Sequence, residues 1–526
     1  MFYRLMASAL MLMLTLTLGC SDEAPGAPLP DTSHDVSSPT VDTSPEDVAA
    51  PSDTSTAEDV TPLEEDAGDA GIAPSLFTTI DVQPNPKNTL SALVHVETNE
   101  AVSVQIAFHA EGVGPFLTGA TETGSSHDLV VVGMRQETTY TFTLQADVNG
   151  EIEIGPEVTF TTGKVPGTIP EFEVTVHKPE LVTPGITLFG LATDTEDPNE
   201  PLYLAVDEAG EIVWYYNDLD ADHNLTDREA RLLPDGRILL SMKSSYRLID
   251  PAGNTLGEII GGPDVGGGLH HDAVLLDNGN FVTLTTEQQT INVPELGGDA
   301  LLRGDKIVEL DANNDVLWTW SSFDHLDTQS FPGQLAKKKN KKKGDYDWTH
   351  ANALQALDGG DALLMSLRHQ HEVLKINRAT GEIEWRLGPF GDFELTQGEW
   401  FYAQHAPELH DDGRIFIYDN GNERPNSPLD YTRGVMYQLD FDAMTATQLW
   451  SYTCPEYGSF LGDIDLLESG NVLVTNGGIR LQGPQAPPGD GRLLEVTQED
   501  EPKLVWELRA SEAFIYRSER ISSFWP

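Results

Sequence analysis

The chain has 526 residues, of which 85 are Asp or Glu and 31 are Lys or Arg, so its formal net charge at pH 7 is -54. This length predicts two or three domains with enough material for buried cores. The acidity excludes a general nucleic-acid binder, because phosphate backbones would be repelled, and two cysteines exclude a disulfide framework or a thiolate zinc site.

Residues 1–20 have the pattern of a secretory signal, in which Arg4 precedes an apolar run that ends at Leu18. Gly19 and Cys20 then resemble the site at which bacterial lipoproteins are cleaved and lipidated, although Thr17 stands where leucine is usual. We expect lipidation at Cys20 and a lipid-anchored location in the cell envelope, periplasmic or at the outer membrane. An ordinary secretory signal is the alternative.

Residues 21–74 contain 14 Asp or Glu and no Lys or Arg, and they have no hydrophobic period. Such a segment cannot bury enough apolar surface to fold. We expect a disordered acidic tether between the lipid and the folded body.

Residues 75–165 change to short strands with a period of two. Alternate residues from Tyr140 to Val148 are apolar, and Asn149-Gly150 then predicts a tight hairpin turn. Strands at this spacing are typical of a small β-sandwich, similar to a fibronectin type III or immunoglobulin domain.

Residues 175–526 contain an internal repeat, in which a hairpin ends at a large apolar residue. The six copies end at Trp214, Ile259, Trp318, Trp385, Trp450 and Trp506. Between them lie strand–turn–strand units, each turning on a glycine, and helical periods are nearly absent. A four-stranded unit buries its faces by stacking radially on its neighbours, so six copies predict an all-β, six-bladed β-propeller.

Three histidines occupy similar places in this repeat. His271 and His405 each lie 8 residues before the turn glycine of their unit, and His350 lies 9 before. If the strand that they begin is the innermost one, they meet at one mouth of the central channel. Arg368 lies 8 residues after Gly360 and should return to the same rim.

Three imidazoles and one guanidinium on one axis predict a site for a small oxyanion, which the fork of an arginine binds with two parallel hydrogen bonds. Three histidines can also hold zinc with an open fourth position, so a metal-dependent hydrolase is an alternative, but Arg368 would repel a dication. We interpret the histidines without repeat equivalents as ordinary hydrogen-bonding residues: His270, His369, His371 and His410.

Four short motifs carry a resemblance to a known family. They are His271-Asp272-Ala273-Val274, Asp347-Trp348-Thr349-His350-Ala351-Asn352, Ser366-Leu367-Arg368-His369-Gln370 and Gln404-His405. Together they resemble the bacterial arylsulfate sulfotransferases that need no nucleotide sulfate donor. The resemblance covers residues 180–520, and the sandwich is similar to that family's amino-terminal domain.

The resemblance implies ping-pong transfer of a sulfuryl group from a phenolic sulfate ester to a phenol, with His405 as the nucleophile. His350 and Arg368 would hold the sulfate oxygens and His271 would assist. Asn352, with Thr475 or Asn476, would add polar contacts to the substrate. No cofactor and no metal are implied.

The implied partners are an aryl sulfate donor, a phenolic acceptor and the membrane, with a homodimer left open. A non-catalytic binding propeller at the cell surface is a further alternative.

Two departures from the family pattern stand out. Ala406-Pro407 follows His405 where a polar residue is expected, and Cys454 has no partner for the family's disulfide. Residues 337–343 are the one dense basic run of the chain. It is either a solvated loop or a means of attracting anionic aryl sulfates or lipid headgroups.

Overall fold

A computed structural model of the protein describes residues 75–167, 169–193, 203–217, 228–262, 265–330, 335–427, 430–480 and 489–525. These residues belong to one compact unit, Ala73–Pro526. The predicted signal segment with Cys20 and the predicted tether lie outside them. No helix within the described ranges is long and apolar enough to span a membrane.

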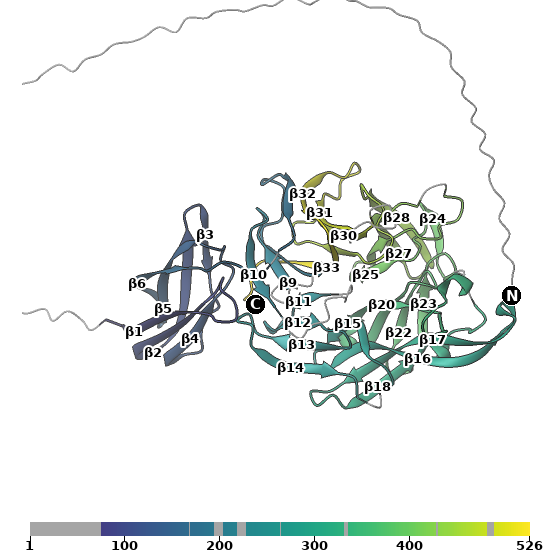
Figure 1. Ribbon diagram of the computed structural model, residues 1–526, viewed down its shortest axis with the longest axis horizontal. Coiled ribbons are helices and arrows are strands. Elements are labelled where there is room, and N and C mark those ends of the chain that lie inside the picture. Colours follow the sequence, from purple (N-terminus) through teal and green to yellow (C-terminus); the bar gives the residue numbers. More distant parts are fainter. Residues whose placement is uncertain are drawn as a thin grey trace, which may run out of the picture. The chain divides into compact units, whose positions relative to one another are not determined.

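The first six strands form the predicted β-sandwich (Figure 1). They are β1 (Phe77–Pro84), β2 (Ala92–Ala110), β3 (Val113–Leu117), β4 (Gly124–Val131), β5 (Thr139–Val148) and β6 (Glu151–Thr161). The long β2 belongs to both faces, because its first half pairs with β1 and β4 and its second half with β3 and β5.

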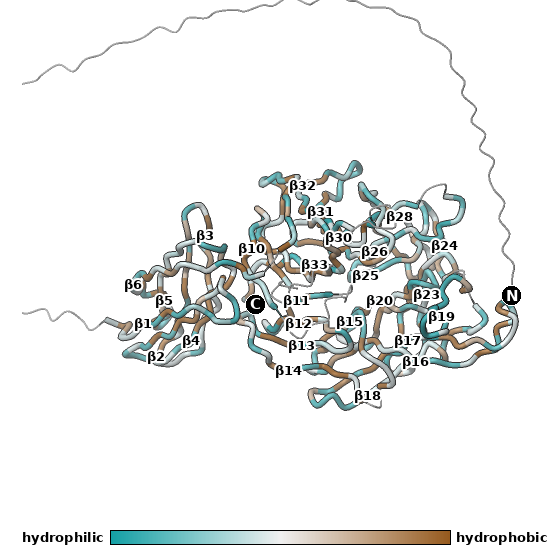
Figure 2. Tube along the Cα trace, in the orientation of Figure 1, coloured by the Kyte–Doolittle hydropathy of each residue, from teal (hydrophilic) through white to brown (hydrophobic). Residues whose placement is uncertain are grey.

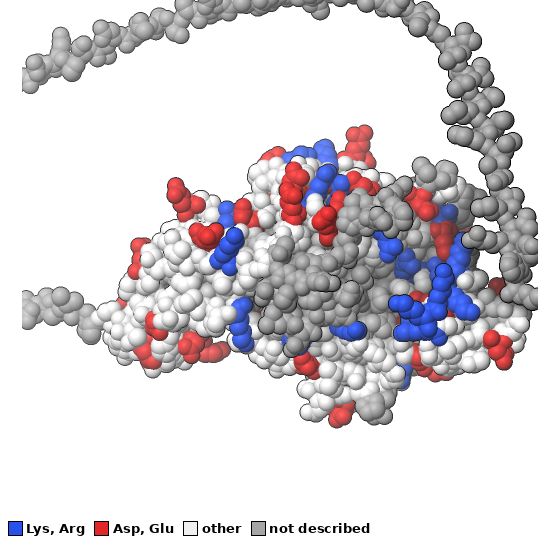
Figure 3. All heavy atoms as spheres, in the orientation of Figure 1, with Lys and Arg blue, Asp and Glu red and all other residues white. Residues whose placement is uncertain are grey.

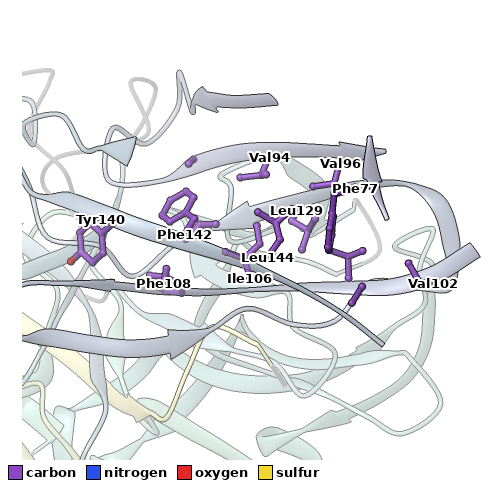
Figure 4. Packing of buried hydrophobic residues seen from close by; sticks show 14 of the residues in the cluster. Phe77, Val94, Val96, Val102, Ile106, Phe108, Leu129, Tyr140, Phe142 and Leu144 are labelled. Atoms are coloured by element: carbon purple, nitrogen blue, oxygen red, sulfur yellow. The ribbon is translucent and has the colours of Figure 1, made fainter. Parts of the chain in front are cut away.

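The predicted apolar face of the sandwich is its core. Tyr140, Phe142 and Leu144 are at most 1% exposed, and they pack with residues of β2 and β4 between the sheets (Figure 4). Asn149 and Gly150 form the predicted two-residue turn, with φ angles of 57° and 90°. The alternation of residue types was therefore sufficient to fix this strand and its inward face.

Six antiparallel sheets follow and are the six predicted blades (Figure 1). From the inner strand outward, the first sheet consists of β33 (Ala513–Ile521), β8 (Ile186–Thr193), β9 (Tyr203–Val206) and β10 (Ile212–Tyr216). The second consists of β11 (Ala230–Leu232), β12 (Ile238–Ser241), β13 (Ser245–Ile249) and β14 (Thr255–Ile260). The third consists of β15 (Leu269–Leu275), β16 (Phe281–Val293), β17 (Gly298–Leu310) and β18 (Val316–Ser321).

The fourth sheet consists of β20 (Ala351–Leu357), β21 (Ala362–Leu367), β22 (Glu372–Asn377) and β23 (Ile383–Leu387). The fifth consists of β25 (His405–Leu409), β26 (Arg414–Asp419), β27 (Arg433–Asp440) and β28 (Thr445–Thr453). The sixth consists of β29 (Asp463–Leu466), β30 (Val472–Ile479), β31 (Asp490–Val496) and β32 (Leu504–Ala510).

Three further strands lie at sheet edges: β19 (Tyr346–Asp347) beside β17, β24 (Glu394–Gln397) beside β28, and β7 (Phe172–His177) beside β32. The short helices in the described ranges are η1 (Pro294–Leu296), α1 (Ser322–His325), η2 (Leu335–Lys338) and η3 (Asp358–Gly360).

Strands from the beginning and the end of the propeller segment complete the sixth and the first sheets. β7, the first strand after the sandwich, lies at the outer edge of the sixth sheet, and β33 is the inner strand of the first sheet. β33 in turn contacts the inner strands β11 and β29 of the two neighbouring sheets. β7 begins at Phe172, three residues before the predicted start of the propeller at 175.

The repeated tryptophans connect neighbouring blades. The indole Nε1 of Trp214 donates to Pro251 O in the next sheet at 2.9 Å, and Trp450 and Trp506 make the same kind of bond to Thr497 O and Glu208 O. In the third blade Trp320 makes this bond, to Gly381 O, two residues beyond the predicted Trp318. In these four blades the repeated tryptophan position therefore supplies an inter-blade hydrogen bond as well as an apolar side chain. Figure 2 shows the hydrophobic stretches within the strands.

A cavity of about 240 Å³ in the propeller's centre is lined by residues on or beside all six inner strands. Its charged lining residues are Glu229, Arg231, Asp272, Glu408, Asp463, Asp465, Arg517 and Glu519. Arg517 bonds Asp272 and Glu229 at 2.9 and 3.2 Å, which leaves more carboxylates than cations. Burial raises the pKa of Asp463 to about 7, although the Arg517 charge opposes the rise, and burial also raises that of Glu519 to about 7.

The free energy of unfolding should therefore fall as the pH rises from about 6.5, the ordinary pKa of histidine, to about 8. Between the ordinary pKa of a carboxyl group and about 7, the folded protein holds protons at Asp463 and Glu519 that the unfolded chain has released, so acidification favours folding in this window. Each unit of raised pKa corresponds to about 1.4 kcal/mol. Thermal unfolding followed by circular dichroism at fixed ionic strength measures the slope.

Asp463→Asn should flatten this pH dependence, because it removes one of the protonated groups. Asp442→Asn, at an exposed aspartate, is the matched control and should keep the wild-type slope. A wild-type protein that is equally stable at pH 6.5 and pH 8 would contradict the expectation.

Candidate active site

The three phased histidines meet at one end of the inner strands. His271 lies in β15, His350 directly precedes β20 and His405 begins β25, so three consecutive blades each supply one. The ring centroids of His271 and His350 are 5.4 Å apart. The ring of Tyr516 in β33 contacts both His271 and His405, with ring centroids 6.0 Å and 6.3 Å apart respectively.

Backbone irregularities direct these side chains. His271 and His350 have left-handed φ angles of 58° and 51°, as does Ala406 after His405 at 44°. In each strand the pairing register shifts beside the histidine. Such bulges reorient side chains and are common at functional sites, where the strained conformation is held by the surrounding structure.

His405 is held as a neutral imidazole with one free ring nitrogen. It is 3% exposed, and its Nδ1 lies 2.6 Å from Asn420 Oδ1. The Asn420 amide donates to the carbonyls of Gly458 and Leu461, both at 2.9 Å, so its oxygen accepts from His405. The proton therefore sits on Nδ1, and Nε2 carries the lone pair.

The pKa of His405 is well below that of an ordinary histidine. Burial is the larger cause and the Arg368 charge the next, although the Asn420 bond opposes both. The sequence predicted the cationic neighbour but not the dominance of burial. Burial likewise lowers the pKa of His271, with the neighbouring His270 adding to the effect.

Arg368 lies at the predicted rim, since its backbone N–H donates to His350 O at 3.1 Å. Among the described residues its guanidinium bonds only neutral groups: Ser459 O at 3.0 Å, His369 Nε2 at 3.2 Å and Asn422 Oδ1 at 3.3 Å. Its Nε has no hydrogen-bond partner among the described residues. A buried cation without an acidic partner is costly, and a bound anion would supply that partner.

His350 is part of an ionic chain. Its Nδ1 lies 2.6 Å from Asp347 Oδ2, and Arg303 Nη2 lies 2.9 Å from the same oxygen. Burial would raise the pKa of Asp347, but His350, His369 and Arg303 together bring it below its usual range. Asp347 therefore stays a carboxylate that can stabilise a protonated His350.

His369 and His270, which we expected to be ordinary hydrogen-bonding residues, also lie beside the phased histidines. The His369 ring lies 4.6 Å from that of His350, and His270 Nδ1 lies 2.8 Å from His271 Nδ1. By contrast, His371 accepts from Ala403 N at 2.9 Å, and His410 pairs with Glu408. Sequence reasoning also missed Asn420, for which no repeat position gave a signal, and Asp347, which lay within a quoted motif.

Asn352 lies beneath the histidines and is fully buried. Its Nδ2 donates to Gln404 O at 2.8 Å, next to His405, and its carbonyl accepts from Tyr516 Oη at 2.9 Å. Its Oδ1 lacks a protein partner in the described ranges. The structure thus places Asn352 where it supports the His405 turn, and its contact with substrate stays a prediction.

Thr475 and Asn476 lie side by side on β30 and are fully buried. Thr475 Oγ1 lies 2.6 Å from Ser518 Oγ. Asn476 accepts from Tyr418 Oη at 2.7 Å and donates to Glu456 O at 2.9 Å. Their polar atoms bond protein groups, and their predicted substrate contacts remain predictions.

Comparison with known proteins follows the same division of the chain. A family model described as Arylsulfotransferase (ASST) matches residues 171–517, and one described as Arylsulfotransferase Ig-like domain matches residues 79–163. The chain belongs to the arylsulfotransferase family. The predicted resemblance is thereby confirmed.

Curated members of the family are similar to this chain over a shorter stretch. Arylsulfate sulfotransferase AssT of Lelliottia amnigena is 28% identical over 138 residues, and the protein of that name from Escherichia coli O6:H1 is 27% identical over 138. Each match covers 20% of this chain and 23% of the relative.

Among solved structures, hydrazine synthase of Kuenenia stuttgartiensis is similar at a TM-score of 0.31 and 10% identity, covering 52% of this chain and 64% of that one. Hsv2 of Kluyveromyces lactis is similar at a TM-score of 0.29 and 8% identity, and the match covers 73% of this chain and 96% of that one.

One group of described residues has the residue types of a metal site. Asp347, His350 and His369 offer ligand atoms within 4.8 Å of one another. However, the Asp347 carboxylate already holds His350 and Arg303. A metal ion there would have to displace these contacts, and the charge of Arg368 would oppose it.

The two departures noted in the sequence lie in different parts of the propeller, and Ala406-Pro407 directly follows His405. Ala406 and Pro407 line the central cavity, and Cys454 is a free, buried thiol. Burial raises the pKa of that thiol to about 12, so it is unreactive.

Proposed function

We propose that this protein is an aryl sulfate:phenol sulfotransferase that works by ping-pong transfer through a sulfohistidine at His405. One observation carries the proposal: Arg368, a cation whose hydrogen bonds in the described part of the chain go to neutral groups, lies close enough to lower the pKa of a buried, neutral His405. An anion-binding group beside an available nucleophile is what group transfer from a sulfate ester requires.

In the first half-reaction, the lone pair of His405 Nε2 attacks the sulfur of the aryl sulfate. The N–S bond forms as the bond from sulfur to the aryl oxygen breaks, and the electron pair leaves with the phenolate. Arg368 stabilises the charge on the three remaining oxygens, by analogy with phosphoryl transfer. Protonated His350, held by Asp347, donates its proton to the phenolate.

In the second half-reaction, His350 takes the proton of the acceptor phenol while the phenol oxygen attacks the same sulfur. The new O–S bond forms and the N–S bond breaks, which restores the neutral His405 with its Nε2 lone pair. The proton returns to His350, so the two steps together balance. The Asn420 bond keeps Nε2 turned toward the reaction throughout, because it occupies Nδ1.

Mass spectrometry of the donor-treated protein tests this proposal. The protein is mixed with excess 4-nitrophenyl sulfate, quenched at alkaline pH because N-sulfohistidine is labile in acid, and digested. We expect one added SO3 group on the peptide containing His405, and its loss when phenol is added before the quench. Release of nitrophenol without a labelled His405 would contradict the sulfohistidine, and the absence of any release would favour a binding propeller.

A metal-dependent hydrolase is the second candidate, because of the Asp347, His350 and His369 group. Dialysis against a chelator distinguishes the two. The transferase should keep its rate and still produce the sulfated acceptor, whereas a hydrolase should lose its activity and regain it with added zinc.

A further inference from the structure

The basic run of residues 337–343 contains one lysine that points inward. Lys338 has a side chain that is 15% exposed, whereas Lys337, Lys339 and Lys341–Lys343 are exposed. Figure 3 shows Lys and Arg side chains gathered over the part of the face around β19 and β23. The run therefore has two parts: a charged outer surface, and a single ammonium group placed within the protein.

Local packing fixes the position of Lys338. It is the last residue of η2, whose Leu335 packs in one cluster with Trp348. The segment returns through an Asn340 N to Asp345 O bond of 2.8 Å and enters β19, which pairs with β17. Lys338 is thus held at the end of η2, which lies beside β19 and so beside the strand that contains Asp347.

Lys338 lies near Arg368, because its partner Glu423 directly follows Asn422, whose Oδ1 accepts from Arg368 Nη2 at 3.3 Å. Its Nζ lies 3.0 Å from Glu423 Oε1. Burial lowers the pKa of Lys338 and Glu423 raises it, and the charges of Arg368 and Asp347 are also felt. An ammonium group has three N–H donors, and Glu423 is the one hydrogen-bonding partner of Lys338 in the described part of the chain.

Two other cations near this group, Arg303 and Arg368, already have assigned partners or roles. Arg303 pairs with Asp347 and Asp345, and Arg368 is the group that the proposed reaction assigns to the sulfuryl oxygens. Lys338 therefore remains as a second cation, with donors available, beside an anion site.

We propose that Lys338 binds a second anionic substituent of the substrate, so that the enzyme prefers aryl sulfates whose ring carries a carboxylate or a second sulfate. This rests on the proposed function of the same site. A carboxylate on the ring receives charge-assisted hydrogen bonds from the free donors of Lys338 while its sulfuryl group lies on Arg368. An uncharged ring leaves these donors unused.

The test compares two esters of matched shape, 4-carboxyphenyl sulfate and its neutral analogue 4-carbamoylphenyl sulfate. The quantity measured is the ratio of their kcat/KM values, which cancels effects common to both. We expect a wild-type ratio above one that falls about tenfold in Lys338→Met and is kept in Lys338→Arg. Lys342→Met removes an exposed charge of the same run and should leave the ratio unchanged.

A wild-type ratio of one or below, or an unchanged ratio in Lys338→Met, would overturn the inference. Lys338→Met also removes the lysine partner of Glu423, so the double variant with Glu423→Gln is needed. It should show the same tenfold fall, and recovery of the ratio would overturn the inference by assigning the effect to Glu423. A wild-type protein that turns over neither ester refutes the proposed function instead.

Discussion

Replacing His405 with asparagine should lower kcat for sulfuryl transfer by at least about three orders of magnitude, since the loss of a covalent nucleophile removes the reaction path itself. Asparagine is polar and smaller than histidine, so it can keep a hydrogen bond to Asn420 but has no nitrogen lone pair to offer. The initial rate of nitrophenol release from 4-nitrophenyl sulfate, with saturating phenol, measures the effect.

His109→Asn is the matched control, because His109 is exposed and lies in the sandwich. It should keep the wild-type rate. Circular dichroism of both variants checks that each is folded. Retention of more than about a tenth of the wild-type rate by His405→Asn would exclude His405 as the nucleophile.

Arg368→Met should lower kcat/KM by about 10²–10³, the usual cost of removing a group that stabilises developing negative charge. Arg368→Lys should recover only part of the loss, because an ammonium keeps the charge without the planar fork. Steady-state kinetics on an aryl sulfate series measures both.

The same substitution should leave the melting temperature unchanged or raise it. Arg368 is a largely buried cation without an ion pair among the described residues, and replacing such a charge with an apolar side chain often stabilises a protein. Arg414→Met, which breaks an exposed pair with Asp412, is the control and should alter neither property appreciably. A variant that loses activity and stability together would show that Arg368 has a structural role.

The predicted site depended on counting residues from the turn glycines. This worked for His271 and His405, because their strands have the same length between histidine and turn. His350 lies one residue further from its glycine, and it still reaches the group because β20 and β21 extend to pair Ala351 with Leu367. Counting therefore located the end of the inner strand. In the fourth blade, longer strands make up for the one extra residue between His350 and its glycine.

The site residues that the sequence did not predict could not be found by counting from the turn glycines. Asn420 reaches His405 from beyond the end of β26, and His369 lies after β21, in the turn that leads to β22. Their positions depend on loop conformations, for which a repeat sets no expectation. Likewise, the six lysines of the basic run are equivalent in the sequence, and Lys338 is distinguished by the packing of Leu335 with Trp348 and by its ion pair with Glu423.

The strand β33 has a consequence for how the protein is made. It carries Tyr516, which lies against His271 and His405, and Arg517, which bonds Asn352 O at 2.8 Å and Asp272 Oδ2 at 2.9 Å. The ribosome synthesises β33 after every other strand of the propeller. A nascent chain therefore has five complete blades and all three phased histidines before it has a finished site, so the proposed sulfuryl transfer can begin only when the last strand has entered the first sheet.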